Sequence, residues 1–137
     1  MKAVAWRSLV VAAMVAGYGA ATPAQRLAVA PGDAFRGEAV YSRCLACHAL
    51  AYDRTGPRHC GVFGRQAGTV AGFLYSDAMK SSGIIWDEGT LDVFLRDPMG
   101  VVPGTAMGYA GIPDDQERAD LIAWLKRESA APQCDGK

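Results

Sequence analysis

Apolar residues along this chain recur mostly three and four positions apart, and runs in which apolar and polar residues alternate are scarce. That spacing is typical of helices and argues against a sheet. A first helix is predicted over about 33–46, with Asp33 as its N-cap. A short helix is predicted over 77–81 and another over 87–96, where Pro98 stops the helix.

The last helix is the clearest element of this pattern. Pro113 is followed by Asp114, and Glu117 stands three residues further on, which is an acidic version of the capping box that opens many helices. Large apolar residues then follow at helical spacing and mark the face that the helix buries. This stripe consists of Leu121, Ile122, Trp124 and Leu125.

Two glycine- and proline-rich stretches separate the helices. Residues 51–72 contain five glycines and one proline, and residues 100–113 contain four glycines and two prolines, so both are predicted to be loops. Loops of this length are uncommon in a compact domain unless something holds them. The pattern therefore predicts an all-α fold of three to five helices, with long ordered loops wrapped around a central group.

The N-terminus has the three-part pattern of a secretory signal peptide. Lys2 and Arg7 supply a positive start, an apolar run covers 9–16, and small residues follow as far as Ala24. Cleavage is expected after Ala21 or Ala24. The alternative is a retained membrane anchor, for which the apolar run is short.

The chain is expected to divide into four parts. Residues 1–24 are the signal peptide, 25–31 a flexible lead-in, 32–130 one folded domain and 131–137 a C-terminal tail. Export predicts a periplasmic protein with no membrane insertion after cleavage. It also places the four cysteines in an oxidising compartment.

Composition narrows the class of protein. Half of the 137 residues are hydrophobic and a fifth are charged, which is a globular composition. The 14 basic residues balance 14 acidic ones, so nothing in the charge points to nucleic acid as a partner.

One motif carries recognisable chemistry. Cys44, Cys47 and His48 form the pattern Cys-x-x-Cys-His, the attachment signature of a c-type haem. Residues three apart on a helical turn lie side by side, with about 5–6 Å between their Cβ atoms. Two thiols so placed reach the two vinyl groups of one haem and form thioethers, while the adjacent imidazole reaches the iron. One covalently bound haem c is therefore the expected cofactor.

Two other interpretations of the paired cysteines are weaker. A thioredoxin-like motif belongs beside a βαβ unit, and the sequence shows no such pattern. A structural zinc site needs four ligands, commonly from two such pairs, and the second pair is missing here.

With this motif in place, the sequence resembles the class I cytochromes c of the mitochondrial and purple-bacterial type. The resemblance extends over about 32–129, nearly the whole of the predicted mature chain. Its matching segments stand in the order typical of that family. Besides the haem motif they are Gly37 with Tyr41, then 55–57, 63–65, 72–78, 83–86, 90–91, Leu95, 97–98, 103–107, 110–112 and 117–126.

The resemblance implies an axial pair for the iron, with His48 as one ligand and Met107 as the other. Among the methionines compared, Met107 alone stands in the context Pro-Gly-Thr-x-Met, whereas Met79 and Met99 do not. A Met/His pair favours ferrous iron and raises the reduction potential. Pro57 is implied to accept the proton of His48 through its backbone carbonyl, which fixes the imidazole.

Further roles are implied for residues around the haem. Arg65, Tyr75 and Trp86 match residues that hold a buried haem propionate, a charge that needs several donors away from water. Thr105, within the methionine motif, is counted with the haem-binding residues. The crossing of the first and last helices is matched by Gly37, Tyr41, Leu121 and Trp124.

Three reactive residues remain after this assignment. In the family fold Cys60 lies in a loop and Cys134 follows the last helix, and we expect a disulfide that ties the tail to the haem loop. His59 is the only other histidine. It falls at a loop position of the family and is expected to be structural or exposed rather than a second haem ligand.

The function implied by the resemblance is one-electron transfer between larger redox proteins, an oxidase, reductase or dehydrogenase, that dock at the haem edge. With both axial positions filled, the iron is closed to substrate, so an enzyme is not expected and peroxidase-like activity ranks last. A monomer is expected. The alternative is a haem subunit or dedicated electron acceptor of a larger periplasmic oxidoreductase, anchored by an uncleaved N-terminus.

The sequence departs from the family in two places. Met79 and Phe94 stand where the family often has asparagine and tyrosine, so the polar network near the axial methionine is expected to be reduced. The lysine ring around the haem edge is mostly gone, with Arg43 and Arg54 left at matching places. Docking is therefore expected to rely more on apolar contact than on charge steering.

Overall fold

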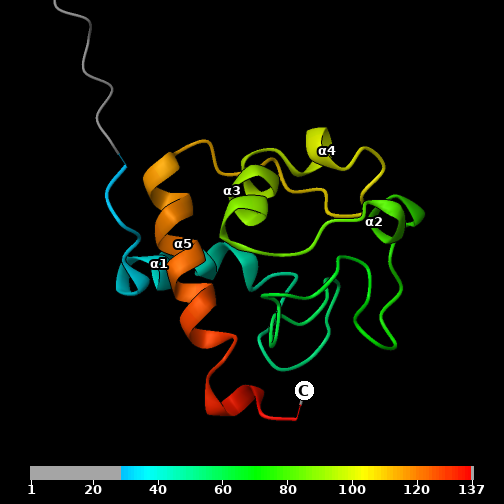
Figure 1. Cartoon of the computed structure of the whole chain (residues 1–137), viewed down its shortest axis with the longest axis horizontal. Coiled ribbons are helices and arrows are strands. Elements are labelled where there is room, and N and C mark those ends of the chain that lie inside the picture. Colours follow the sequence, from blue (N-terminus) through cyan, green and yellow to red (C-terminus); the bar gives the residue numbers. More distant parts are fainter. Residues whose placement is uncertain (1–28, 137) are drawn as a thin grey trace, which may run out of the picture.

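Two helices from opposite ends of the domain cross at one side of the molecule (Figure 1). The computed structural model describes residues 29–136. Helix α1 spans Ala34–Tyr41 and helix α5 spans Asp115–Glu128. Between them lie three shorter helices and the long loops. Among the described residues there is no sheet, and the only strand-like pairing is an isolated bridge between Gln66 and Ile85.

The shorter elements occupy the middle of the chain. The helices are α2 (Asp77–Ser81), α3 (Glu88–Arg96) and α4 (Pro98–Val101), and two 3₁₀ turns cover Ser42–Cys44 and Pro132–Cys134. Helix α3 packs beside α5, whereas α2 lies at the far side of the molecule from the α1–α5 crossing (Figure 1). The all-α fold class predicted from the sequence is confirmed.

The crossing depends on a glycine and an aromatic pair. A Cβ on Gly37 would lie 2.0 Å from the backbone oxygen of Asp120, so a side chain at this position would push the two helices apart. Beside it, the rings of Tyr41 and Trp124 stack with their centroids 3.9 Å apart. Leu121 is 1 % exposed in the same contact. These are the four residues that the resemblance assigned to the crossing.

Short polar side chains start the helices. The carboxylate of Asp33 accepts from the backbone N–H of Phe35, and that of Asp114 accepts from the N–H of Glu117 at 2.8 Å. The capping box predicted for α5 is only half formed, because the Glu117 carboxylate binds Arg43 at 2.6 and 2.7 Å instead of returning to the N-cap.

The helix boundaries differ from the sequence prediction at two points. Helix α1 ends at Tyr41 and tightens into the 3₁₀ turn, short of the predicted end near residue 46. Pro98 opens α4 as well as ending α3, with Asp97 as N-cap, so part of the predicted loop 100–113 is helical. Proline suits the first position of a helix because the N–H that it lacks has no partner there.

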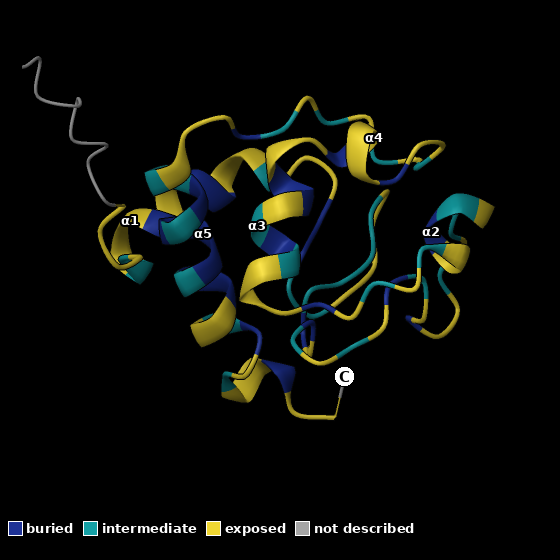
Figure 2. Cartoon of the chain, turned by 45° about the horizontal axis from the view of Figure 1, so that its top comes forward, coloured by how far each residue is buried: buried dark blue, intermediate teal, exposed yellow. Residues whose placement is uncertain are grey.

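The core fills the space between the α1–α5 crossing, α3 and the loops, as the buried segments in Figure 2 show. Met79 and Phe94, the two apolar departures from the family, are 8 % and 5 % exposed and belong to this core. Phe94 also contacts Trp86, with the ring centroids 5.0 Å apart. The region therefore packs as an apolar cluster, as the departures predict.

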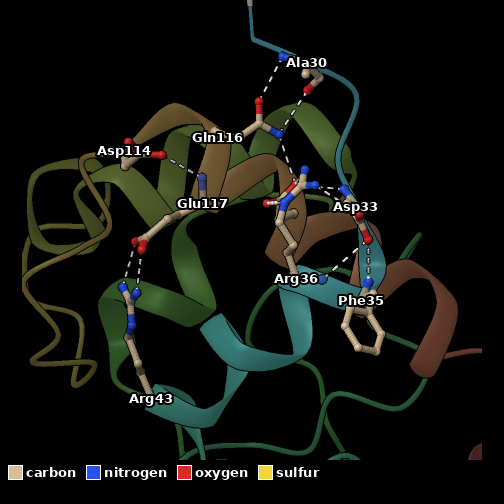
Figure 3. Close-up of polar contacts among 9 residues, drawn as sticks. Ala30, Asp33, Phe35, Arg36, Arg43, Asp114, Gln116 and Glu117 are labelled. Carbon is tan, nitrogen blue, oxygen red and sulfur yellow. Dashed lines mark hydrogen bonds and ion pairs between the residues drawn. The ribbon is translucent and has the colours of Figure 1, made fainter.

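The described start of the chain is fastened to α5 (Figure 3). The N–H of Ala30 donates to the Gln116 side chain at 2.9 Å, and the Gln116 amide donates back to the Ala30 carbonyl at 3.2 Å. A Cβ on Gly32 would lie 2.1 Å from the Ala119 oxygen. The described part of the lead-in predicted as flexible, residues 29–31, is therefore held in place. Its backbone is hydrogen-bonded to α5, and the chain packs closely against that helix at Gly32.

The predicted signal peptide, 1–24, lies outside the described residues. None of the helices in 29–136 has the length and apolar character needed to cross a membrane.

Candidate haem-binding site

The Cys-x-x-Cys-His motif lies where α1 gives way to a tight turn. The N–H of Cys47 donates to the Cys44 carbonyl at 3.0 Å, and the N–H of His48 donates to the same oxygen at 2.8 Å. Both thiols are free; Cys44 is half-buried and Cys47 is exposed. Burial raises the pKa of Cys44 to about 11, so this group is a neutral thiol at physiological pH.

His48 is held in one protonation state by its neighbour. Its Nδ1 lies 2.8 Å from the Pro57 carbonyl oxygen, which only accepts, so Nδ1 carries the proton. Burial lowers the pKa of His48, and the Pro57 bond opposes that shift. The ring is therefore neutral, and Nε2, which has no hydrogen-bond partner among the described residues, keeps its lone pair. This is the form of imidazole that binds a metal.

A glycine leaves room for that ring. A Cβ on Gly56 would lie 2.3 Å from His48 Cε1, closer than any side chain is tolerated. The N–H of Gly56 donates to the Cys47 carbonyl at 2.7 Å, which brings the loop back to the motif. The family segment 55–57 thus supplies both the space for the imidazole and the acceptor for its proton.

The loop after His48 is fastened to the C-terminal tail. Cys60 and Cys134 form a disulfide across a sequence separation of 74, which confirms the pairing expected from the resemblance. Beside it, the N–H of Gly61 donates to the Ser129 carbonyl at 2.9 Å. The tail at 132–134 therefore forms part of the support for the haem loop.

The three residues assigned to a propionate lie near one another. Arg65 donates to the Cys60 and Arg58 carbonyls at 2.8 and 3.0 Å, and its own carbonyl accepts from the Trp86 N–H at 3.0 Å. Burial lowers the pKa of Arg65, and the nearby Tyr75 opposes that shift. Burial also raises the pKa of Tyr75, so its hydroxyl remains a donor at neutral pH. Together they form a partly buried cationic and hydroxyl-bearing patch suited to a carboxylate.

Met107 lies on the other long loop, half-buried against the core. Its N–H donates to the Thr105 hydroxyl at 3.2 Å, and the Thr105 N–H donates to the Val102 carbonyl at 2.9 Å. The loop ends at Ile112, whose N–H donates to the Leu95 carbonyl at 2.8 Å. Thr105 therefore shapes the backbone at Met107.

A buried arginine closes this second loop. Arg118, on α5, is fully buried and donates to the carbonyls of Ile112 and Pro113 at 2.8 and 3.0 Å. It also bonds Asp92 at 2.7 Å, and it pairs with Asp115. Sequence reasoning missed this residue, because nothing in the pattern distinguishes a buried arginine from the exposed ones on the same helix.

His59 is placed more specifically than the sequence prediction of a structural or exposed residue. Its ring stacks on that of His48 with the centroids 4.3 Å apart, and its Nδ1 is hydrogen-bonded to the Tyr41 hydroxyl at 3.1 Å. Burial, with His48 and Arg65 close by, lowers the pKa of His59 to about 3. Since its ring lies against the face of His48, it does not stand opposite His48 as a second axial ligand.

The donor set fits a covalent haem. One turn offers two free thiols and a neutral imidazole, a second loop offers a thioether, and a third region offers donors for a carboxylate. Residues 29–136 contain no group of three or more His, Cys, Asp and Glu side chains that could hold a metal ion.

Comparison with known proteins agrees with this geometry. The family model for cytochrome c matches residues 34–128. Cytochrome c2 of Rhodomicrobium vannielii is 46 % identical over 114 residues, covering 81 % of this chain and 91 % of the relative. Cytochrome c2 of Blastochloris viridis is 46 % identical over 101 residues (72 % and 80 %). Cytochrome c of Tetrahymena pyriformis is 52 % identical over 100 residues (72 % and 91 %).

A solved structure extends the agreement to the fold. Cytochrome cH from Methylobacterium extorquens superimposes with a TM-score of 0.69 at 43 % identity, covering 70 % of this chain and 99 % of that one. The chain therefore belongs to the cytochrome c family, close to cytochrome c2 and mitochondrial cytochrome c, and is a monohaem electron carrier with covalent haem c rather than an enzyme.

Proposed function

We propose that Cys44 and Cys47 hold the haem through thioethers and that His48 and Met107 are its axial ligands, in a periplasmic carrier of single electrons. The observation that carries this assignment is the turn at 44–48, which joins two free thiols to an imidazole already committed to the right tautomer. The haem supplies the one-electron couple of its iron.

Residues of this chain are proposed to orient the iron ligands and to shield the redox centre. Pro57 holds the Nδ1 proton of His48, so Nε2 stays free as the ligand atom. Arg65, Tyr75 and Trp86 are proposed to receive a propionate, whose charge Arg65 balances in a partly buried position. Met79 and Phe94 keep the surroundings of Met107 apolar. A ligand pair that fills both axial positions leaves outer-sphere transfer through the haem edge as the chemistry.

We further propose that residues 1–24 direct export and are removed, leaving 32–130 as the haem domain, 131–137 as its tail and a monomer in the periplasm. The partners are larger redox proteins, an oxidase, reductase or dehydrogenase, and not nucleic acid. The described residues contain no membrane-spanning helix, which is compatible with a carrier that moves between such partners. A mature protein that retained 1–24 would instead support the anchored-subunit alternative.

We propose that association with redox partners at the haem edge depends only weakly on charge. Arg43, one of two basic residues left at the expected edge, is paired with both carboxylate oxygens of Glu117. Arg54 is bonded to the Leu45 carbonyl. The Arg43 charge is therefore balanced by a carboxylate, whereas Arg54, whose carbonyl partner is neutral, keeps its full charge. The association rate with an oxidase or dehydrogenase should therefore change little with ionic strength, and a steep fall with added salt would contradict this.

The attachment is tested by peptide mass spectrometry of protein isolated from the native periplasm. The expected result is a start after Ala21 or Ala24 and one porphyrin mass on the peptide that contains Cys44 and Cys47. Variants Cys44→Ala and Cys47→Ala should each leave a single thioether. Material without porphyrin on this peptide would refute the proposal.

A further inference from the structure

Next to the proposed iron ligand lies a second imidazole that the function described so far does not use. The ring of His59 stacks on that of His48 with 4.3 Å between centroids and 20° between planes. The backbone fixes this placement, because the N–H of His59 is shared between the carbonyls of Ala49 and Leu50, both at 3.1 Å. The loop backbone therefore holds His59 beside His48.

His59 is also held from the far side. Its Nδ1 is hydrogen-bonded to the Tyr41 hydroxyl at 3.1 Å, and the Tyr41 ring meets it edge-on with 5.7 Å between centroids. Tyr41 is 4 % exposed and is itself stacked on Trp124 of α5. A continuous set of contacts thus runs from the α1–α5 crossing through Tyr41 and His59 to His48.

The contacts of His48 show what this arrangement adds. The imidazole is held at Cγ by its covalent bond and at Nδ1 by the Pro57 bond, so the ring can still tilt about the line through those two atoms. A flat ring stacked on its face restricts that rotation, whereas an aliphatic side chain fills the space without fixing a plane. Neighbours that orient a metal ligand in this way tune the metal.

We propose that His59 is a positioning residue that sets the ring plane of His48, and that the Tyr41 hydroxyl holds His59 in place. The proposal rests on the proposed role of His48 as an iron ligand. The plane of an axial imidazole governs how its π orbitals overlap with the iron, so it governs how the unpaired electron of the ferric protein spreads over the haem.

The test compares proton NMR spectra of the ferric holoprotein and of Tyr41→Phe, His59→Leu and the double variant. Tyr41→Phe keeps the ring on Trp124 and removes only the hydroxyl. The haem methyl shifts should change their pattern in both single variants, and the double variant should match His59→Leu, because the hydroxyl acts through His59. Tyr52→Phe, which removes a hydroxyl from a tyrosine that is 63 % exposed, is the matched control and should leave the shifts unchanged.

A second readout separates positioning from general loosening. In the ferrous protein the Nδ1 proton of His48 should exchange with solvent about fivefold faster in Tyr41→Phe, the effect of one net hydrogen bond. The Leu121 amide of α5 serves as the internal reference and should change less. This measurement remains informative if His59→Leu does not fold.

The outcomes are distinct. Equal acceleration at His48 and Leu121, additive methyl shifts in the double variant, or unchanged shifts in all variants would overturn the positioning role while leaving the proposed function intact. A parent protein without histidine and methionine coordination would instead refute the proposed function.

Discussion

The two loops that carry the proposed iron ligands are built differently. The loop after His48 is bonded to itself, to the motif and to the tail, and a disulfide and an aromatic stack cross it. The loop around Met107 is held mainly at its ends, by α4 on one side and by Arg118 on the other, with the Thr105 hydroxyl as its local support.

This difference assigns different tasks to the two loops. The loop after His48 has the denser set of bonds, so we expect it to keep its geometry during electron transfer. The methionine side has fewer bonds along its length and belongs with the segments that open first. The ligand that leaves the iron first under stress should therefore be Met107, and the changes below weaken one loop at a time.

Removing the disulfide should have the largest effect. The double variant Cys60→Ser/Cys134→Ser opens a loop with a separation of 74 residues, and the chain-entropy relation predicts a loss of about 4 kcal/mol in the free energy of unfolding. Denaturant titration measures it. Reductant should reproduce the loss in the parent and do nothing further to the variant. A loss under about 1 kcal/mol would show that the tail adds little to the histidine side.

Replacing Arg118 weakens the methionine side. Arg118→Met keeps the aliphatic volume but leaves the Ile112 and Pro113 carbonyls without their donor, so we expect a loss of about 3 kcal/mol and earlier release of Met107 in denaturant. The matched control is Arg96→Met. Arg96 pairs with the same two carboxylates, Asp92 and Asp115, but is exposed, and its loss should stay within about 0.5 kcal/mol. Similar losses in both variants would assign the effect to charge pairing rather than to the loop.

A methyl group at Gly56 tests the space beside His48. The added Cβ would meet His48 Cε1 at 2.3 Å, so Gly56→Ala should cost about 2 kcal/mol and disturb the bond to Pro57. Gly89→Ala is the comparison, because on α3 the new Cβ meets only Asp87 Oδ1 at 3.5 Å and the helix gains from alanine. Thermal unfolding distinguishes them: destabilisation is expected for Gly56→Ala and slight stabilisation for Gly89→Ala. If Gly56→Ala is as stable as the parent, the imidazole is not confined as described.

Low pH should weaken the contact between Arg36 of α1 and Asp120 of α5, at the helix crossing that supports both loops. The hydrogen bond from Arg36 holds the pKa of the buried Asp120 carboxyl down at about 2, below its ordinary value of 3.8, with Asp33 and Gln116 (Figure 3) assisting. Since the folded pKa is the lower one, this stabilisation is complete above about pH 4 and is lost as the pH falls towards 2. It amounts to about 1 kcal/mol because Arg36 is half-exposed and solvent screens the pair.

Asp120→Asn provides the check on that titration. The stability difference between parent and variant should narrow between pH 4 and pH 2, and the histidine and methionine loops should respond alike. A difference that stays constant over this range would show that Asp120 does not titrate as described.

Much of this arrangement follows from local sequence. The N-cap residues Asp33 and Asp114, the helix at 77–81 and the glycine-rich loops are local features, and a single segment is enough to predict them. The Cys-x-x-Cys-His motif is equally local. Its chemistry could therefore be predicted without a fold.

The rest depends on contacts between distant segments. The place of His59 against His48 depends on how residues 49–60 fold back, and the burial of Arg118 depends on where the second loop ends. The Glu117 side chain does not complete the capping box at Asp114, because it pairs instead with Arg43, 74 positions away. Helix propensity and residue spacing carry no information about such competition between distant partners.

The most direct test of the axial assignment is the absorption spectrum of the ferric protein compared with that of Met107→Ala. The parent should be low-spin and show the methionine–iron charge-transfer band, and Met107→Ala should lose that band while retaining covalent haem. Met99→Ala, which truncates an exposed methionine, should keep it. A band that survives in Met107→Ala, or a parent with five-coordinate iron, would contradict the account.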